Sequence, residues 1–158
     1  MRKEIRRRDR IMEYDQALEV LKECEYGTLS MINDEHEPYG IPISFVLVDK
    51  YLYFHSALSG YKMDNFKLNN QVSFSCVGKT QPIYAKNFTT YFQSVIVYGK
   101  IEFIEDDEIK REALEALCIK YLPNDMDKFE ENFEMSKKFT AVYHLSIENL
   151  SAKEKKAK

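Results

Sequence analysis

The stretch His55-Ser-Ala-Leu-Ser-Gly-Tyr-Lys-Met-Asp-Asn65 stands at a change in the hydrophobic pattern of this 158-residue chain. The alternating run over residues 51–55 predicts a β-strand, and an amphipathic segment over residues 63–68 predicts a short helix. If Ser59 caps this helix, the N–H groups that follow stay unpaired, and the positive end of the helix dipole faces the strand end. Gly60 lets the chain turn tightly there. The stretch therefore predicts a strand–helix junction that can bind an anion.

The polar side chains at this junction suit a phosphate. Lys62 and Asn65 are three residues apart on the predicted helix and share a face, so an ammonium group and an amide can reach one ligand. Ser56 and Ser59 add hydroxyl groups, and helix N-termini are common phosphate sites. The alternative is a solvated turn that merely contains these residues, and His55 alone is more often a structural strand residue than a ligand or an acid.

Length and composition indicate one domain over residues 1–150, followed by a disordered basic tail over residues 151–158. Hydrophobic residues make up 44% and charged residues 31% of the chain, which is ordinary for a globular protein. The net charge of −3 supplies no overall basic field for nucleic acid. Residues 2–10 are basic and residues 105–134 are acidic. They could form a docking pair or a phosphate clamp, although solvated segments are the default interpretation.

The three cysteines, Cys24, Cys76 and Cys118, are odd in number and form no CxxC pair. We interpret them as reduced thiols, two in helices and one in a strand, rather than as a disulfide frame or a zinc site. No signal-type segment opens the chain, and no apolar run approaches membrane-spanning length. We therefore expect a cytoplasmic protein with neither a membrane nor a nucleic-acid partner.

Hydrophobic periodicity predicts six strands, three longer helices and one short helix. The strands cover residues 26–32, 39–48, 51–55, 71–77, 89–104 and 139–147, and the helices cover residues 15–24, 63–68, 106–121 and 125–138. Residues 78–88 should form a long loop. Pro42 cannot donate to a ladder, so its part of the strand should lie at an edge or a bulge, and Gly99 should mark a bend. Short antiparallel strands of this number favour a small Greek-key barrel in the α+β class.

Five motifs then occur in an order that resembles a known family. They are Arg6-Arg-Arg-Asp-Arg10, Tyr26-Gly-Thr-Leu-Ser30, Pro38-Tyr-Gly-Ile-Pro-Ile43, His55-Ser-Ala-x-x-Gly-x-Lys62-x-x-Asn65 and Thr90-Tyr-Phe-Gln-Ser-Val-Ile-Val-Tyr-Gly99. Over residues 6–147 the chain resembles the FMN-binding split-barrel superfamily, and within it the pyridoxamine 5′-phosphate oxidase-like proteins of the nitroimidazole-resistance type. The resemblance implies a six-stranded antiparallel Greek-key split β-barrel with flanking helices, assembled as a homodimer with FMN at each subunit interface.

The resemblance also implies a set of cofactor-binding residues. Those expected along the isoalloxazine ring are Pro42, Ile43 and Ser44. Those expected at the ribityl phosphate are Ser56, Lys62 and Asn65, with His55, Ala57 and Gly60 in the same motif. Those expected to approach the cofactor from the same or the partner subunit are Tyr91, Ser94 and Val95.

The chain also departs from the family pattern. Ser44-Phe45 stands where many relatives have Asn-Tyr, which leaves the hydrogen bonds to the flavin edge open. The turn over residues 33–38 lacks the Gly common there. The Trp- and Arg-containing substrate-binding terminus of true pyridoxamine phosphate oxidases is absent, because the chain has no Trp. Vitamin B6 oxidation is therefore not expected.

Three functions remain on this basis. The leading hypothesis is a flavin-dependent oxidoreductase of a small molecule such as a nitroaromatic compound, in which His55 polarises or protonates the substrate or is purely structural. The second is a flavin- or haem-binding protein without turnover, in which His55 could be an axial ligand. The third is a barrel that stacks nucleic-acid bases on Tyr and Phe, which the negative charge disfavours.

Overall fold

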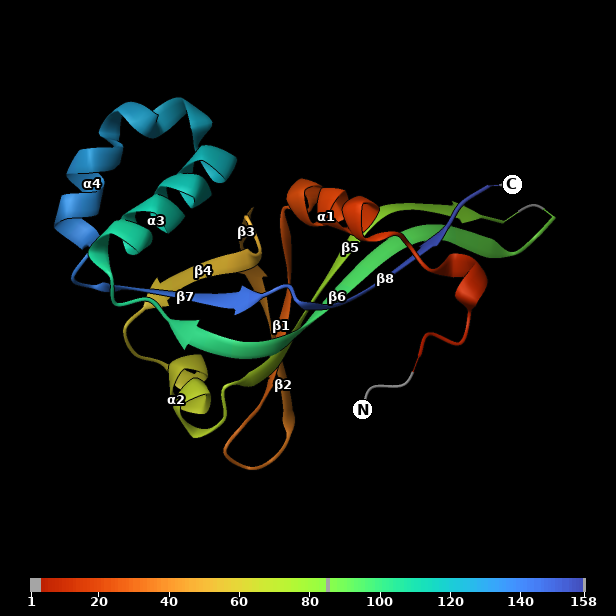
Figure 1. Cartoon of the computed structure of the whole chain (residues 1–158), viewed down its shortest axis with the longest axis horizontal. Coiled ribbons are helices and arrows are strands. Elements are labelled where there is room, and N and C mark those ends of the chain that lie inside the picture. The colour runs from red at the N-terminus through yellow and green to blue at the C-terminus, as the bar shows by residue number, and fades with distance from the viewer. Residues whose placement is uncertain (1–3, 85, 158) are drawn as a thin grey trace.

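An antiparallel β-sheet of eight strands dominates the computed structural model, which describes residues 4–84 and 86–157 (Figure 1). Seven strands follow one path in the order β2-β1-β5-β6-β7-β4-β3, and β8 pairs with β6 off this path. The strands are β1 (Tyr26–Ile32), β2 (Pro38–Ser44), β3 (Val46–Val48), β4 (Tyr51–Ala57), β5 (Gln71–Ile83), β6 (Thr89–Phe103), β7 (Thr140–Ser146) and β8 (Asn149–Lys155).

In the described part of the chain, four α-helices and two 3-10 helices surround this sheet. They are η1 (Arg8–Arg10), α1 (Tyr14–Glu23), α2 (Tyr61–Leu68), α3 (Asp107–Tyr121), η2 (Pro123–Lys128) and α4 (Phe129–Ser136). The α3 helix packs beside β3, β4 and β7, whereas α2 connects β4 to β5 (Figure 1). Asp106 caps α3, because its carboxylate accepts the N–H groups of Glu108 and Ile109 at 3.0 and 2.9 Å. Of the helices described, none combines the length and the apolar character that crossing a membrane demands.

The β6 strand changes partner along its length, and this change gives the sheet its split form. Residues 92–98 pair with β8 and residues 101–103 pair with β7, while β5 follows the other edge. Gly99 lies at the change, where an added Cβ would stand 2.8 Å from the Leu145 Cδ1 atom. Gly99 therefore marks the passage of β6 from one half of the barrel to the other, where a bend was expected.

A buried cluster fills the space inside the curled sheet. Its largest fully buried side chains are aromatic: Phe45, Phe54, Phe74 and Tyr143. Burying one large apolar side chain of this kind stabilises a fold by roughly 1.5–3 kcal/mol. A smaller buried cluster packs α3 against the other face of the sheet. It consists of Val46, Tyr53, Ala113, Leu117 and Val142. The barrel and its helical layer thus have separate apolar contacts.

The α+β class and the antiparallel split barrel are confirmed, but there are eight strands rather than six. The strand expected over residues 39–48 breaks at Phe45 into β2 and β3, because side chains of α3 bind the Phe45 backbone. The loop expected over residues 78–88 is shorter, since β5 continues through an irregularity between Val77 and Thr80 as far as Ile83. The extra pairing turns β5 and β6 into one long hairpin.

The prediction of a disordered tail over residues 151–158 was wrong for residues 151–155. These residues belong to β8, which pairs with β6 from Tyr98↔Asn149 to Phe92↔Lys155. The N-terminal segment packs on β8 in turn, since the Met12 N–H donates to the Ala152 carbonyl oxygen at 3.1 Å. Backbone pairing with β6 holds this charged stretch in a strand. Its sequence has no apolar alternation that would have predicted a strand. Arg2 and Lys3 of the basic arm lie outside the described residues.

Several helix boundaries also differ from the expectation, and α2 begins at Tyr61 rather than at residue 63. Glu13 occupies the N-cap position of α1, so the helix begins one residue before Asp15. The helix expected over residues 125–138 is divided into η2 and α4 and ends at Ser136. Helix ends depend on local hydrogen bonds, which the apolar spacing does not report.

Candidate functional site

The residue at the N-cap position of α2 is Gly60 and not the predicted Ser59. Gly60 is the N-cap residue, with φ 129° and ψ 167°, a conformation open almost only to glycine. The prediction that Ser59 caps the helix was wrong, because no side chain makes a cap hydrogen bond here. The Gly60 carbonyl accepts the N–H of Met63 at 2.9 Å. The N–H groups of Tyr61 and Lys62 have no acceptor in the described part of the chain, so they can bind an anion.

Lys62 brings a positive charge to this turn without a carboxylate to balance it. Its side chain is half-buried, and within residues 4–84 and 86–157 it forms no ion pair or hydrogen bond. Burial lowers the pKa of its ammonium group. Partial burial of an unpaired charge is unfavourable, and a bound anion would compensate for it.

His55 lies near the end of β4, close enough to Lys62 to sense its charge. Desolvation is the main cause that lowers the pKa of the imidazole, and the charge of Lys62 is the second. A lowered pKa favours the neutral form of the ring. It makes no hydrogen bond to another described residue, so both ring nitrogens are available to a ligand.

Ser56 and Asn65 are turned toward the interior beside this surface. The Ser56 hydroxyl donates to the Ala57 carbonyl oxygen at 3.1 Å and lies 3.5 Å from the Met63 sulfur. Asn65 is only 1% exposed, and neither amide atom has a hydrogen bond of good geometry, although the Tyr61 hydroxyl is near. A buried polar group left unpaired costs roughly 1–3 kcal/mol. The structure therefore does not present the Asn65 amide to a phosphate at the surface.

The β2 strand lies at the edge of the sheet, as Pro42 required. Pro42 stands opposite Thr28 of β1 and is exposed, whereas Ile43 packs against the core. The Tyr39 ring of β2 meets the Tyr61 ring of α2 edge to face, with centroids 5.0 Å apart. This contact brings β2 next to the first turn of α2.

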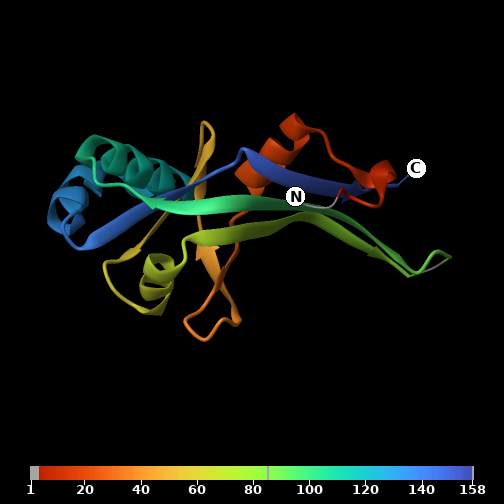
Figure 2. The same ribbon diagram turned by 60° about the horizontal axis from the view of Figure 1, so that its bottom comes forward.

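The three predicted residues of β6 do not join this group within one chain. Figure 2 shows the β5–β6 hairpin extending to the end of the molecule opposite α2. Tyr91 pairs with Gln81 and Ser94 pairs with Val77 along this hairpin. Val95 is fully buried in the core, so its side chain is not available to a ligand.

Two residues of α3 that sequence reasoning did not assign to the site hold the backbone beside Ser44. The Lys120 Nζ donates to the carbonyl oxygens of Phe45 and Cys24 at 2.8 and 2.7 Å. The Tyr121 hydroxyl accepts the Phe45 N–H at 3.0 Å. A cation in the last turn of a helix is common for other reasons, so the sequence carries no signal of this role. Within the described residues, no three His, Cys, Asp or Glu side chains gather in a way that could hold a metal ion.

Comparison with known proteins places the chain in a family. Residues 13–154 match the pyridoxamine 5′-phosphate oxidase family, and the protein belongs to this family. The resemblance found in the sequence motifs is thereby confirmed. No curated protein matches the sequence.

Many solved structures are similar to this one, among them the three that follow. A proposed 5-nitroimidazole antibiotic resistance protein from Bacteroides thetaiotaomicron has a TM-score of 0.77 and 21% identity, covering 91% of this chain and 85% of its own. The flavocytochrome Anf3 from Azotobacter vinelandii has a TM-score of 0.78 and 20% identity, covering 92% and 68%. A FAD-binding protein from Mesorhizobium loti has a TM-score of 0.66 and 19% identity, covering 93% and 98%. At these identities the likeness shows a shared fold.

Proposed function

We propose that this protein is a flavoprotein that binds FMN between the subunits of a homodimer and uses it in redox chemistry on a small molecule. The observation that carries the proposal is Lys62, a half-buried ammonium group with no carboxylate partner in the described chain. It stands beside two unpaired N–H groups at the positive end of α2. The terminal phosphate of FMN supplies the negative charge and the acceptor oxygens that this turn lacks.

The fold relatives support a flavin among the possible phosphate compounds. Both the FAD-binding protein from Mesorhizobium loti and the flavocytochrome Anf3 carry a flavin in their names. We favour FMN over FAD for this chain because one lysine and one helix N-terminus suit a single terminal phosphate. The backbone edge of β2 that faces away from β1, at Pro42, Ile43 and Ser44, would hydrogen-bond the rim of the ring system.

We propose a homodimer because of the position of the β6 residues. Tyr91 and Ser94 lie on the hairpin directed away from α2 (Figures 1 and 2), so a site that contains them together with Lys62 needs two chains. The hairpin exposes apolar side chains, with exposed fractions of 74% for Tyr84 and 85% for Phe88. Such apolar surface is common at protein interfaces. We propose that the hairpin of one subunit completes the α2 site of its partner.

The roles of the protein residues follow from this placement. The flavin, when bound, supplies the transfer of electrons. Lys62 anchors the phosphate, and the edge of β2 orients the ring. His55, whose lowered pKa favours the neutral ring, accepts a proton from the substrate or polarises it by a hydrogen bond. Nitroaromatic compounds are the first substrates to test, given the name of the Bacteroides relative.

A second candidate function is flavin or haem binding without turnover. The observation that favours it is the neutral, unpaired imidazole of His55, which is suited to bind haem iron. A Soret band in the purified protein would support haem. Flavin absorption that bleaches with a nicotinamide donor would support the enzyme instead.

The experiment that tests the proposal is an absorption spectrum of the purified protein and the mass of the cofactor that it releases, repeated for Lys62→Ala. Lys67→Ala is the matched control, because Lys67 is an exposed lysine of the same helix. We expect the mass of FMN in the wild-type protein, a several-fold lower FMN occupancy in Lys62→Ala, and wild-type occupancy in the control. Full occupancy in Lys62→Ala would refute the phosphate site, and a protein that takes up neither flavin nor haem would refute both candidate functions.

A further inference from the structure

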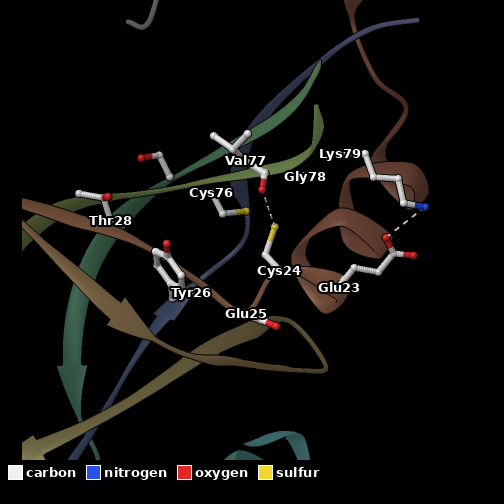
Figure 3. A pocket seen from close by; sticks show the side chains of 11 residues that line it. Glu23, Cys24, Glu25, Tyr26, Thr28, Cys76, Val77, Gly78 and Lys79 are labelled. Atoms are coloured by element: carbon white, nitrogen blue, oxygen red, sulfur yellow. Dashed lines mark hydrogen bonds and ion pairs between the residues drawn. The ribbon is translucent and has the colours of Figure 1, made fainter. Parts of the chain in front are cut away.

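Cys24 and Cys76 are neighbours in space, although their sequence spacing gives no hint of it. Cys24 follows the last residue of α1, and Cys76 lies within β5. Figure 3 shows their sulfur atoms turned toward each other. The Cys24 thiol donates to the Val77 carbonyl oxygen at 3.3 Å, and the Cys76 thiol lies close enough to influence the pKa of Cys24. Both cysteines are free, so two reduced thiols from different elements are in contact.

The two sulfur atoms lie at the inner wall of an open cavity of about 600 Å³. Cys24 is 7% exposed and Cys76 is 3% exposed. Lys79 and Glu23 form an ion pair of 3.6 Å between residues that line the same cavity (Figure 3). Because so little of each thiol is accessible, a very small reagent can reach the sulfur atoms more easily than a bulky one.

The chemical environment makes the two thiols unequal. The polar contact with the Cys76 thiol is the main cause that lowers the pKa of Cys24, and the charge of Lys120 also lowers it, against the effect of burial. The same contact, together with burial, raises the pKa of Cys76. Lys120 is held nearby because its Nζ donates to the Cys24 carbonyl oxygen at 2.7 Å. Cys24 is thus suited to be the nucleophile and Cys76 the proton donor.

We propose that Cys24 and Cys76 form a redox site that reduces a hydroperoxide and closes to an intramolecular disulfide. The Cys24 thiolate attacks one peroxide oxygen, the O–O bond breaks, and the leaving oxygen takes a proton to become an alcohol, or water when the reagent is hydrogen peroxide. Cys24 is then a sulfenic acid. The Cys76 sulfur attacks the Cys24 sulfur, the S–O bond breaks, and water leaves. Two thiols lose two electrons and two protons, and the hydroperoxide gains both.

This site is separate from the phosphate end of the proposed flavin site, because none of its cavity-lining residues belongs to α2 or to the end of β4. The β1 residues that line the cavity do pair with β2, the strand proposed to carry the flavin ring. The disulfide would join the end of α1 to β5, beside the Lys120 contacts with Cys24 and Phe45. A thiol reductant would restore the two thiols by exchange. The proposed redox site therefore does not depend on the proposed phosphate site at Lys62.

The decisive test uses the wild-type full chain with its cofactor. The folded protein is treated with increasing hydrogen peroxide, its remaining thiols are alkylated, and it is digested with trypsin. We expect the peptide of residues 23–50 linked by a disulfide to the peptide of residues 68–79, lost again after reduction. The peptide of residues 112–120, which holds Cys118, should stay alkylated. Unmodified Cys24 and Cys76, earlier oxidation of Cys118, or a link between two chains would overturn the proposal.

Variants assign the roles within the pair. In Cys76→Ser the sulfenic acid at Cys24 should accumulate and be trapped when the oxidised protein is unfolded in the presence of dimedone, whereas Cys24→Ser should leave Cys76 unoxidised. Cys118→Ser is the matched control and should form the disulfide as the wild type does. Circular dichroism checks that each variant is folded. Should a variant fail to fold, the wild-type peptide map still decides, because it requires no substitution.

Discussion

Lys120 reaches from the last turn of α3 to Phe45, where its Nζ lies 2.8 Å from the carbonyl oxygen and 3.9 Å from the ring centroid. The Phe45 peptide interrupts the strand between β2 and β3 and follows Ser44 directly. Its buried polar groups need partners that a continuous ladder would otherwise supply. The side chain of a helix distant in sequence therefore sets where β2 ends, and with it the position of the edge proposed to carry the flavin.

Lys120→Met should destabilise the protein. The substitution keeps most of the apolar stem but leaves the Phe45 and Cys24 carbonyl oxygens without their donor. A hydrogen bond from a charged group contributes about 1.5–3 kcal/mol, so we expect a loss of this order in the free energy of unfolding, measured with urea. Lys128→Met, at an exposed lysine of η2, is the control and should be close to neutral. Equal stability of Lys120→Met and the wild type would contradict this role.

Gly27→Ala should be damaging, because Gly27 is buried on β1 and leaves no room for a side chain. An added Cβ would stand 2.3 Å from the Phe74 Cζ atom and 2.5 Å from the Ser75 carbonyl oxygen. Overpacking of this kind costs typically about 1–3 kcal/mol, measurable as a lower midpoint of thermal unfolding. Gly40→Ala on the neighbouring strand is the matched control, since its nearest atom would be 3.3 Å away in the Thr28 side chain. If both variants unfold at the same temperature, the close packing around Gly27 does not limit the stability of the fold.

The pKa of His55 should respond to Lys62. In the protein without an anionic ligand, an NMR titration should give a value below the usual 6.5. Lys62→Met should raise this pKa without restoring 6.5, because desolvation is the larger cause. Lys67→Met should leave it unchanged. Between the folded-state pKa and 6.5 the unfolded chain binds more protons, so His55 makes stability rise with pH in that window and fall as the pH drops through it. A titration of His55 identical in Lys62→Met and the wild type would show that the two groups do not interact.

A shared flavin site can be tested by mixing two inactive variants. Lys62→Ala disables the α2 side of a site, and Tyr91→Ala disables the hairpin side. A heterodimer of the two contains one site with both defects and one site with neither. If the hairpin of the partner completes the site, unfolding and refolding the variants together should restore FMN binding at one of the two sites in each heterodimer. No recovery, with both variants folded and dimeric by light scattering, would place all the residues of a site in one chain.

The sequence was informative where short-range patterns decide the outcome. The alternating residues of β4 and β7, the apolar stripes of α1 and α3, and the Pro that keeps β2 at an edge were all readable from spacing and residue type. The junction between β4 and α2 was predicted as well, although the cap is Gly60 and not Ser59. A side-chain cap and a glycine turn share the same local composition, so only the backbone angles separate them.

The amino-acid sequence by itself determined the α+β class, the family and the group of residues around Lys62, because periodicity and motifs act over a few neighbouring positions. The tertiary structure decided the break at Phe45, the pairing of the charged β8 strand, the burial of Asn65 and the contact between Cys24 and Cys76. Each of these depends on groups far apart in the chain that meet only after folding. Backbone hydrogen bonds and side chains of helices form these long-range contacts. Neither produces a periodic pattern in the sequence from which the contacts could be predicted.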